Sequence, residues 1–274
     1  MTANYLQQQM NEIIAWEAQE PWMITTALNY ALSPLAWAAR IVVPDVAISG
    51  MMTGADWIAG LTARESWVLA EAGTSTLAEV KQLPLQQQDA MADSVHNWSI
   101  AQASAEGALT GTFGLPGIAA DIPAIITIAF RTIRQVALCY GFPIDGDTEY
   151  EFAVSVLGLA GATSNKDKLA SLAFLQAMKT MIGNSTIKQM GTKAASTKIS
   201  QEAVFLSLKH VAKQLGYNLT KKKALQVIPA IGGVVGGTSN GAFIRSVGWA
   251  ARRAYQRRLL EERGEQIVAG PQQP

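Results

Sequence analysis

The apolar stretch over residues 107–141 constrains the fold more strongly than any other part of the chain. It reads GALTGTFGLPGIAADIPAIITIAFRTIRQVALCYG, and residues 122–130 are apolar on every side of a helix apart from one threonine. A helix that is apolar all round is buried, either in protein or in lipid. Arg131 and Arg134 lie on the one polar stripe of the second half. The stretch therefore predicts a buried central helix.

The ends of this central helix are marked by residues with known capping preferences. Asp121 precedes an Ile-Pro pair, and Asp at the N-cap with Pro in the first turn is typical of a helix start. Gly141 followed by Pro143 is typical of a helix stop. We therefore predict a helix over residues 121–140 in which Asp121 is a capping residue. The alternative is a functional carboxylate, because a buried acid requires a partner.

Helical periodicity also dominates the rest of the chain. It predicts further helices over residues 2–16, 85–109, 147–159, 167–182 and 245–263. The predicted fold class is all-α, a single multi-helix domain with glycine-rich apolar core segments, and 274 residues allow one large domain or two small ones. Charged residues make up 16% of the chain, against about 25% in ordinary soluble domains. The charged fraction is therefore low for a cytosolic protein.

A second glycine-rich stretch, residues 224–244, carries no charge over 21 positions. That length could span a bilayer. However, Pro229 and residues 238–240 interrupt it, so we favour a segment that packs in protein. Small residues recur every four positions, which allows another helix to approach closely. We expect the two glycine-rich regions to pack on each other, and the helix-packing glycines are Gly107, Gly111, Gly114, Gly117, Gly233, Gly237 and Gly241.

Two backbone states are open for the glycines around Gly237. In a helix, Ala at this position should be mild or even stabilising, because Gly costs up to about 1 kcal/mol relative to Ala. In a loop with positive φ angles, Ala would be harmful.

The charges are distributed unevenly between the two parts of the chain. Residues 1–165 carry a net charge of −11 and residues 166–274 a net charge of +12. One explanation is that the two parts pack together and neutralise each other. The other is a basic face for anionic lipid or another acidic partner. The residues expected on such a basic surface are Lys221, Lys222, Lys223, Arg252, Arg253, Arg257 and Arg258.

The single cysteine and the N-terminal sequence indicate a cytoplasmic location. Cys139 excludes an internal disulfide and fits a reducing compartment. The first residues show neither a basic region nor a long apolar core, so we expect no signal peptide. The tryptophans of the first part are expected to be core anchors rather than residues of a bilayer interface; they are Trp16, Trp22, Trp37, Trp57, Trp67 and Trp98.

Common catalytic and cofactor motifs are absent from the sequence. Residues 237–241 match the pattern G-x-S-x-G around Ser239, but no His follows this serine, as that mechanism requires. No phosphate-binding or dinucleotide-binding glycine motif is present. One Cys and two well-separated His make a metal site improbable. The lysines show no aromatic-interleaved nucleic-acid motif. We therefore expect no catalytic set, no cofactor, no metal and no nucleic-acid partner.

Several long segments resemble the EcsC family. They are GLPGIAADIPAIITIAFRTIRQVALCYGF, the following EYEFAVSVLGLAGA, the region from Asp89 to Asp93, and IPAIGGVVGGTSNGAFIRSVGWAARRAYQRRLLEE. The resemblance implies a mostly helical, cytoplasmic bacterial protein without a catalytic set to carry over. It divides the chain into a helical extension (1–16), an EcsC-like helical domain (17–263) and a frayed tail (264–274). The family is named for an operon that also encodes an ABC transporter and is linked to secretion.

These observations favour a non-enzymatic protein that associates with lipid at the inner face of the cytoplasmic membrane. An accessory role for an ABC transporter, secretion or the envelope follows from the resemblance. One alternative is a soluble enzyme that uses a buried Asp and an Arg, and another is a structural partner of a membrane transporter. The candidate functional residues are Asp93, Asp121, Arg131 and Arg134.

Overall fold

The computed structural model describes residues 2–20, 54, 58–60, 62–112, 115–143, 147–162, 164–185 and 229–265. Within these ranges the regular structure is helical and contains no strand, so the predicted all-α fold is confirmed. The helices are α1 (Thr2–Ala18), α4 (Glu65–Ala72), α5 (Leu77–Val80), α6 (Leu85–Thr112), α7 (Leu115–Cys139), α8 (Asp147–Ala160), α9 (Asn165–Ser185) and α11 (Pro229–Glu262). The expectations for Gly114, Trp22, Trp37, Trp57, Lys221, Lys222 and Lys223 lie outside the described residues.

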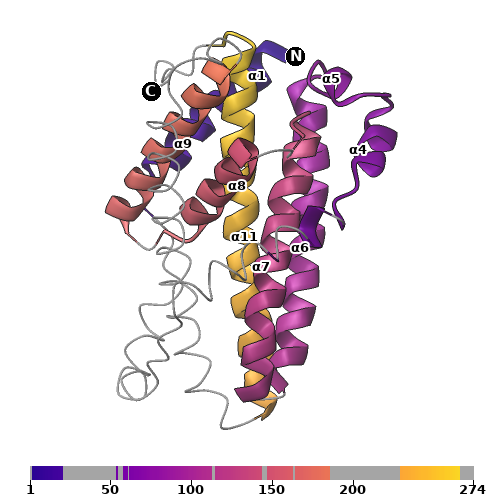
Figure 1. Ribbon diagram of the computed structural model, residues 1–274, viewed down its shortest axis with the longest axis vertical. Coiled ribbons are helices and arrows are strands. Elements are labelled where there is room, and N and C mark those ends of the chain that lie inside the picture. Colours follow the sequence, from indigo (N-terminus) through magenta and orange to yellow (C-terminus); the bar gives the residue numbers. More distant parts are fainter. Residues whose placement is uncertain are drawn as a thin grey trace.

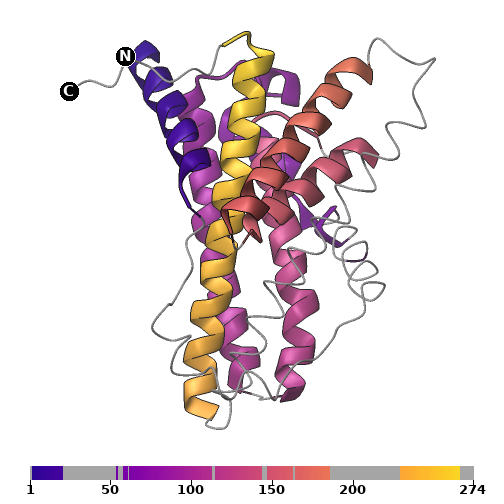
Figure 2. The same cartoon turned by 90° about the vertical axis from the view of Figure 1, so that its left-hand side faces the viewer.

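Three long helices, α6, α7 and α11, run side by side along the long axis of the molecule and form a stem (Figures 1 and 2). Helix α11 packs most extensively on α6 and also contacts α7. The shorter helices gather toward one end of the stem. Helices α1, α8 and α9 lie on the α11 side, and α4 and α5 lie on the α6 side (Figure 1).

The end of α7 agrees with the sequence prediction, but its beginning does not. Gly141 follows the helix with a φ of 77°, a conformation that favours glycine. A Cβ atom at this position would also lie only 2.6 Å from the carbonyl oxygen of Leu77. At the other end, α7 begins at Leu115, so Asp121 lies within the helix and is not its N-cap, and Pro123 is an interior residue.

The apolar face of α7 explains why the Asp-Ile-Pro signal does not start the helix. Proline in a helix interior removes one backbone hydrogen bond and costs about 3 kcal/mol. The turns after it bury Ile126, Phe130 and Ile133 completely, and burying each such side chain contributes about 1.5–3 kcal/mol. This packing offsets the local penalty.

Helix α11 joins two segments that the sequence analysis treated separately, the glycine-rich stretch and the basic helix. Gly237 and Gly241 lie within it and are not among the described glycines with positive φ, so the loop alternative is wrong for them. In the part of the chain that the structure describes, no helix has both the length and the hydropathy needed to cross a bilayer.

The glycines of α11 let it approach α6 closely. A Cβ atom on Gly237 would lie 2.8 Å from the carbonyl oxygen of Ser104, and one on Gly241 would collide with the hydroxyl of the same serine. Ser104, the α6 residue that faces these glycines, thus precedes the glycines of α6 that were expected at the contact. Two of those glycines, Gly107 and Gly111, are nevertheless buried.

The core between α7, α8 and α11 is aromatic. Phe142 and Phe152 flank Tyr255, with ring centroids 5.7 and 5.1 Å away, and all three side chains are fully buried. The expected core position of the tryptophans is wrong for Trp98, which is 68% exposed. Its neighbours one turn away, Ser94 and Gln102, are polar, and this pattern could have indicated an exposed face.

Candidate functional site

The four α11 arginines expected on a basic surface are all ion-paired. Three of them are also buried, so the expectation of a basic surface is wrong for these three. The side chains of Arg252, Arg253 and Arg258 are only 6–8% exposed. The pairs join Arg252 to Asp89 and Asp93, Arg253 to Glu12, Arg257 to Glu17, and Arg258 to Glu149. All these acids come from the acidic first part of the chain. The ion pairs thus agree with the explanation that the two oppositely charged parts pack together.

Asp89 is the centre of a buried polar network between α1, α6, α7 and α11. Its two carboxylate oxygens accept hydrogen bonds from the hydroxyls of Tyr5 (2.7 Å) and Tyr140 (2.6 Å) and from the amide of Gln256 (3.0 Å). The guanidinium of Arg252 lies 3.5 Å away. Burial raises the pKa of Asp89, while Arg252 and the two tyrosine hydroxyls oppose that rise. Burial also raises the pKa of both tyrosines, and Asp89 raises it further.

This network fits a structural role better than a catalytic one. Asp89 is 1% exposed, and four donors already surround its carboxylate, which leaves no side for a substrate. The enzyme alternative rests on Asp121 and an arginine, and the side chain of Asp121 lies outside the described part of the structure, so that alternative stays a prediction. Sequence reasoning did not single out Asp89, because nothing in its local sequence indicates that two distant tyrosines converge on it.

The N-terminal helix α1 buries Met10 and Ile13 in the core and is also attached to the stem through polar side chains. The side-chain oxygen Oε1 of Gln9 accepts hydrogen bonds from Arg253 (2.9 Å) and Gln256 (3.1 Å), and the carboxylate of Glu12 lies 2.7 Å from the guanidinium of Arg253. Together with the hydroxyl of Tyr5, these contacts hold α1 against the end of the stem where the short helices gather.

The candidate residues predicted from the sequence do not converge on one site. Asp93, whose side chain is 46% exposed, pairs with Arg252 on α11. Arg134 is half-buried, and a Cβ atom on Gly60 would lie 3.2 Å from its guanidinium. Arg131 lies in a groove described below. The side chain of Asp121 is outside the described part of the structure.

A groove with a volume of about 340 Å³ lies between α4, α6 and α7. We call it the tryptophan groove; its lining residues are Arg64, Trp67, Val95, Trp98, Ser99, Arg131 and Gln135. The Gln135 amide fixes one wall, since it accepts a hydrogen bond from the backbone N–H of Arg64 (2.8 Å) and donates one to its carbonyl oxygen (3.0 Å). Arg131 donates a hydrogen bond to the side-chain oxygen Oε1 of Gln102 (3.3 Å).

The tryptophan groove combines exposed aromatic surface with positive charge. Among its described lining residues are two arginines and no carboxylate. Trp98 is 68% exposed, and Leu109, which is 66% exposed, lies eleven residues further along α6. Eleven residues are close to three helical turns, so these two side chains lie on the same side of the helix.

His96 lies at the contact between α6 and α11. Its Nε2–H donates a hydrogen bond to the carbonyl oxygen of Arg245 (3.0 Å), and its ring packs nearly perpendicular to that of Trp249, with the ring centroids 5.6 Å apart. Gly248 makes room for this ring, because a Cβ atom there would collide with it. Burial lowers the pKa of His96, although the hydrogen bond to the carbonyl opposes that change.

The lowered pKa of His96 predicts a loss of stability in acid. A histidine whose pKa is lower in the folded protein stabilises the fold above its unfolded pKa of about 6.5. That contribution is lost as the pH falls through the folded pKa. We expect the urea midpoint of unfolding to fall from pH 7 to pH 5, and to fall less steeply in His96→Gln. Equal slopes in the two proteins would contradict this assignment.

Within the described ranges, no three His, Cys, Asp or Glu side chains are grouped so that they could hold a metal ion. The structure thus defines a helical protein with a cationic, aromatic surface groove and a buried polar network around Asp89. The sequence model of the EcsC protein family matches residues 7–260. The chain therefore belongs to the EcsC protein family, as the resemblance implied.

Two relatives from Bacillus subtilis (strain 168) are similar to this chain. The protein YdbA, described as uncharacterized, is 27% identical over 190 residues, which are 69% of this chain and 64% of YdbA. The protein EcsC is 24% identical over 160 residues, which are 58% of each chain. The matched part thus spans less than two thirds of either relative. No solved structure matches the chain significantly.

Proposed function

We propose that the protein binds peripherally to anionic membrane surfaces through the tryptophan groove. The observation that carries this proposal is the exposure of Trp98 beside Arg64 and Arg131, with no carboxylate among the described residues of the groove. Tryptophan is enriched at membrane–water interfaces, where its ring lies at the level of the headgroups. Arginines near an anionic leaflet contribute about 1 kcal/mol each.

The rest of the described surface supports the choice of this groove. Four arginines of α11 form ion pairs within the protein and are not available to lipid; they are Arg252, Arg253, Arg257 and Arg258. Leu109 extends the exposed apolar surface along the same side of α6. A position at the membrane is also compatible with the accessory role for a transporter that the family resemblance implies.

Vesicle flotation tests the proposal. The protein is expected to float with phosphatidylglycerol vesicles at low salt, to float less at high salt because exposed charges are screened, and not to float with phosphatidylcholine vesicles. Exchange of Arg64 and Arg131 for Gln removes about 2 kcal/mol of attraction, so the double variant should partition roughly 30-fold more weakly. Trp98→Ala should also weaken flotation.

Helix α9 provides matched controls. Leu169, which is 65% exposed, and the exposed Lys166 lie outside the groove. Leu169→Ala and Lys166→Gln should therefore float like the unmodified protein. The proposal fails if the unmodified protein does not float with anionic vesicles, or if these controls reduce flotation as much as the groove variants do.

A further inference from the structure

A larger cavity, with a volume of about 730 Å³, lies between α1, α8, α9 and α11, and we call it the head cavity. It does not share lining residues with the tryptophan groove. Its wall combines the rings of Trp16 and Trp249 with the cationic side chains of Lys168 and Arg245. A cavity that is partly apolar and has a few placed polar groups is typical of a ligand site.

Lys168 is a buried cation without a carboxylate partner among the described residues. It is 6% exposed, and its ammonium donates hydrogen bonds to the backbone carbonyl oxygens of Trp16 and Gln19, the latter at 2.6 Å. The ammonium also lies 4.5 Å from the centre of the Trp16 ring. Burial lowers its pKa, and only the more distant charge of Glu17 opposes this change. A buried charge of this kind is costly unless it is paired.

The other charges of the head cavity leave Arg245 available as well. Of the two acids in its wall, Glu12 is paired with Arg253 (2.7 Å), and Glu20 accepts a hydrogen bond from Asn165 (2.9 Å). The exposed guanidinium of Arg245 makes no ion pair or hydrogen bond with any residue that the structure describes. The cavity therefore offers two cations to an anionic group.

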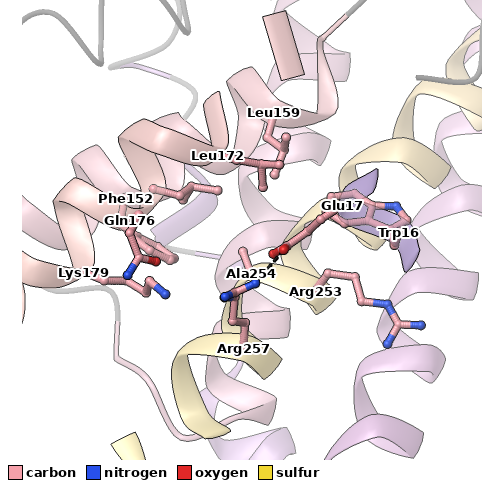
Figure 3. A pocket seen from close by; sticks show the side chains of 11 residues that line it. Trp16, Glu17, Phe152, Leu159, Leu172, Gln176, Lys179, Arg253, Ala254 and Arg257 are labelled. Carbon is pink, nitrogen blue, oxygen red and sulfur yellow. Dashed lines mark hydrogen bonds and ion pairs between the residues drawn. The ribbon is translucent and has the colours of Figure 1, made fainter. Parts of the chain in front are cut away.

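A second cavity, with a volume of about 240 Å³, adjoins the head cavity, and we call it the chain cavity (Figure 3). The two cavities share Trp16, Leu159 and Arg253 in their walls. In Figure 3, Leu159 of α8 and Leu172 of α9 lie beside each other, above Ala254 of α11. Phe152 and Leu175 complete this apolar lining.

The polar groups around the chain cavity are mostly occupied, with one exception in the shared wall. Arg257 pairs with Glu17 at 2.5 Å, as Figure 3 shows, and Lys179 pairs with Glu261. The Nε of Arg253, in contrast, is buried and donates to no acceptor in the described structure. Buried donors normally have an acceptor, so this group is a further donor that a polar ligand could use.

We propose that the two cavities together bind a single-chain amphipathic anion. Its carboxylate or phosphate head lies in the head cavity near Lys168 and Arg245. Its hydrocarbon chain passes Trp16 and Leu159 into the chain cavity. This ligand site is separate from the membrane-binding surface proposed above, so the failure of one proposal does not decide the other.

Isothermal titration with three amphiphiles of equal chain length tests this site. Dodecanoate and dodecyl phosphate carry the two anionic heads, dodecyltrimethylammonium carries a cationic one, and all three are used below their micelle concentrations. We expect at least one anion to bind and the cation not to bind, and the tighter anion identifies the head group. Absence of binding by both anions, or equal binding of the cation, would overturn the proposal.

Substitutions in the two cavities test whether the amphiphile binds there rather than elsewhere on the protein. Arg245→Gln and Lys168→Met should each weaken binding by roughly 10- to 100-fold, the effect of losing one hydrogen bond to a charged group. Lys166→Met, which removes an exposed lysine two residues away, should have no effect. Leu172→Trp narrows the chain cavity, so it should weaken dodecyl ligands more than butyl phosphate.

Two further comparisons keep the test decisive. Because Lys168→Met leaves two carbonyl oxygens without their donor, its thermal melt is compared with that of Arg245→Gln, which has no described contact to lose. If both variants fold and bind like the unmodified protein, the proposal is wrong. It is also wrong if Trp98→Ala, in the tryptophan groove, abolishes amphiphile binding while Arg245→Gln does not.

Discussion

Replacement of Asp89 by Ala is expected to lower the free energy of unfolding by about 3–5 kcal/mol, the cost of removing one partner from a buried charge pair. The change removes the acceptor of Tyr5, Tyr140 and Gln256 and one of the two carboxylates beside Arg252. Buried donors without an acceptor carry a penalty of about 1–3 kcal/mol each. Urea unfolding followed by circular dichroism at neutral pH measures the effect.

Asp93 provides the matched control for this experiment. It lies one helical turn after Asp89 and pairs with the same Arg252, but its side chain is 46% exposed. Because Asp93 is half exposed and Arg252 keeps Asp89 as a partner, the loss from Asp93→Ala should be close to that of a surface ion pair, about 0–1 kcal/mol. Asp89→Asn keeps the shape but loses the charge, and it should fall between the two. Equal costs for Asp89→Ala and Asp93→Ala would show that the network does not hold the helices together.

The second large effect is expected at Gly237, on the contact between α6 and α11. A leucine there must displace the backbone of α6, and overpacking of this kind costs about 1–3 kcal/mol or more. Because even a Cβ atom would lie 2.8 Å from the carbonyl oxygen of Ser104, Gly237→Ala should also destabilise the protein. This corrects the expectation that Ala would be mild or stabilising in a helix.

Gly54 is the control for the glycine experiment. Its backbone is also helical, but a Cβ atom there would have no neighbour within 4 Å. Gly54→Ala should therefore leave the melting temperature unchanged or raise it slightly, since Ala favours the helix. Thermal melts of the three variants test the contact. A harmless leucine at Gly237 would mean that α6 and α11 do not pack as closely as the structure indicates.

Local sequence was sufficient to predict most helices and the end of α7. The predicted ranges 2–16, 85–109, 147–159 and 167–182 correspond to α1, α6, α8 and α9 within a few residues. Helix formation depends on side chains within about one turn and on capping residues, which the sequence displays directly. Gly141 is a stop signal of this kind, and its φ of 77° agrees with the prediction.

The beginning of α7 and the exposure of Trp98 were decided by packing. The cap signal at Asp121 is a local preference worth about 0.5–2 kcal/mol, and the buried face of α7 outweighs it. For Trp98, its large apolar side chain favoured the core, but α6 turns this position toward the groove between α4 and α7. The beginning of α7 could not be derived from one segment alone, whereas the polar neighbours Ser94 and Gln102 were a local indication for Trp98.

The sequence by itself determined the helical class, most helix boundaries, the family and the opposite charges of the two parts of the chain. Only the tertiary structure decided which charges meet. Arg252, Arg253 and Arg258 resemble a basic surface in sequence. Apart from Glu262, one turn after Arg258, the acids that pair with them lie more than 100 residues away. The same holds for Asp89, whose partners come from α1, α7 and α11. Local propensity sets most helix boundaries, whereas the partners of a helix depend on how distant helices share one core.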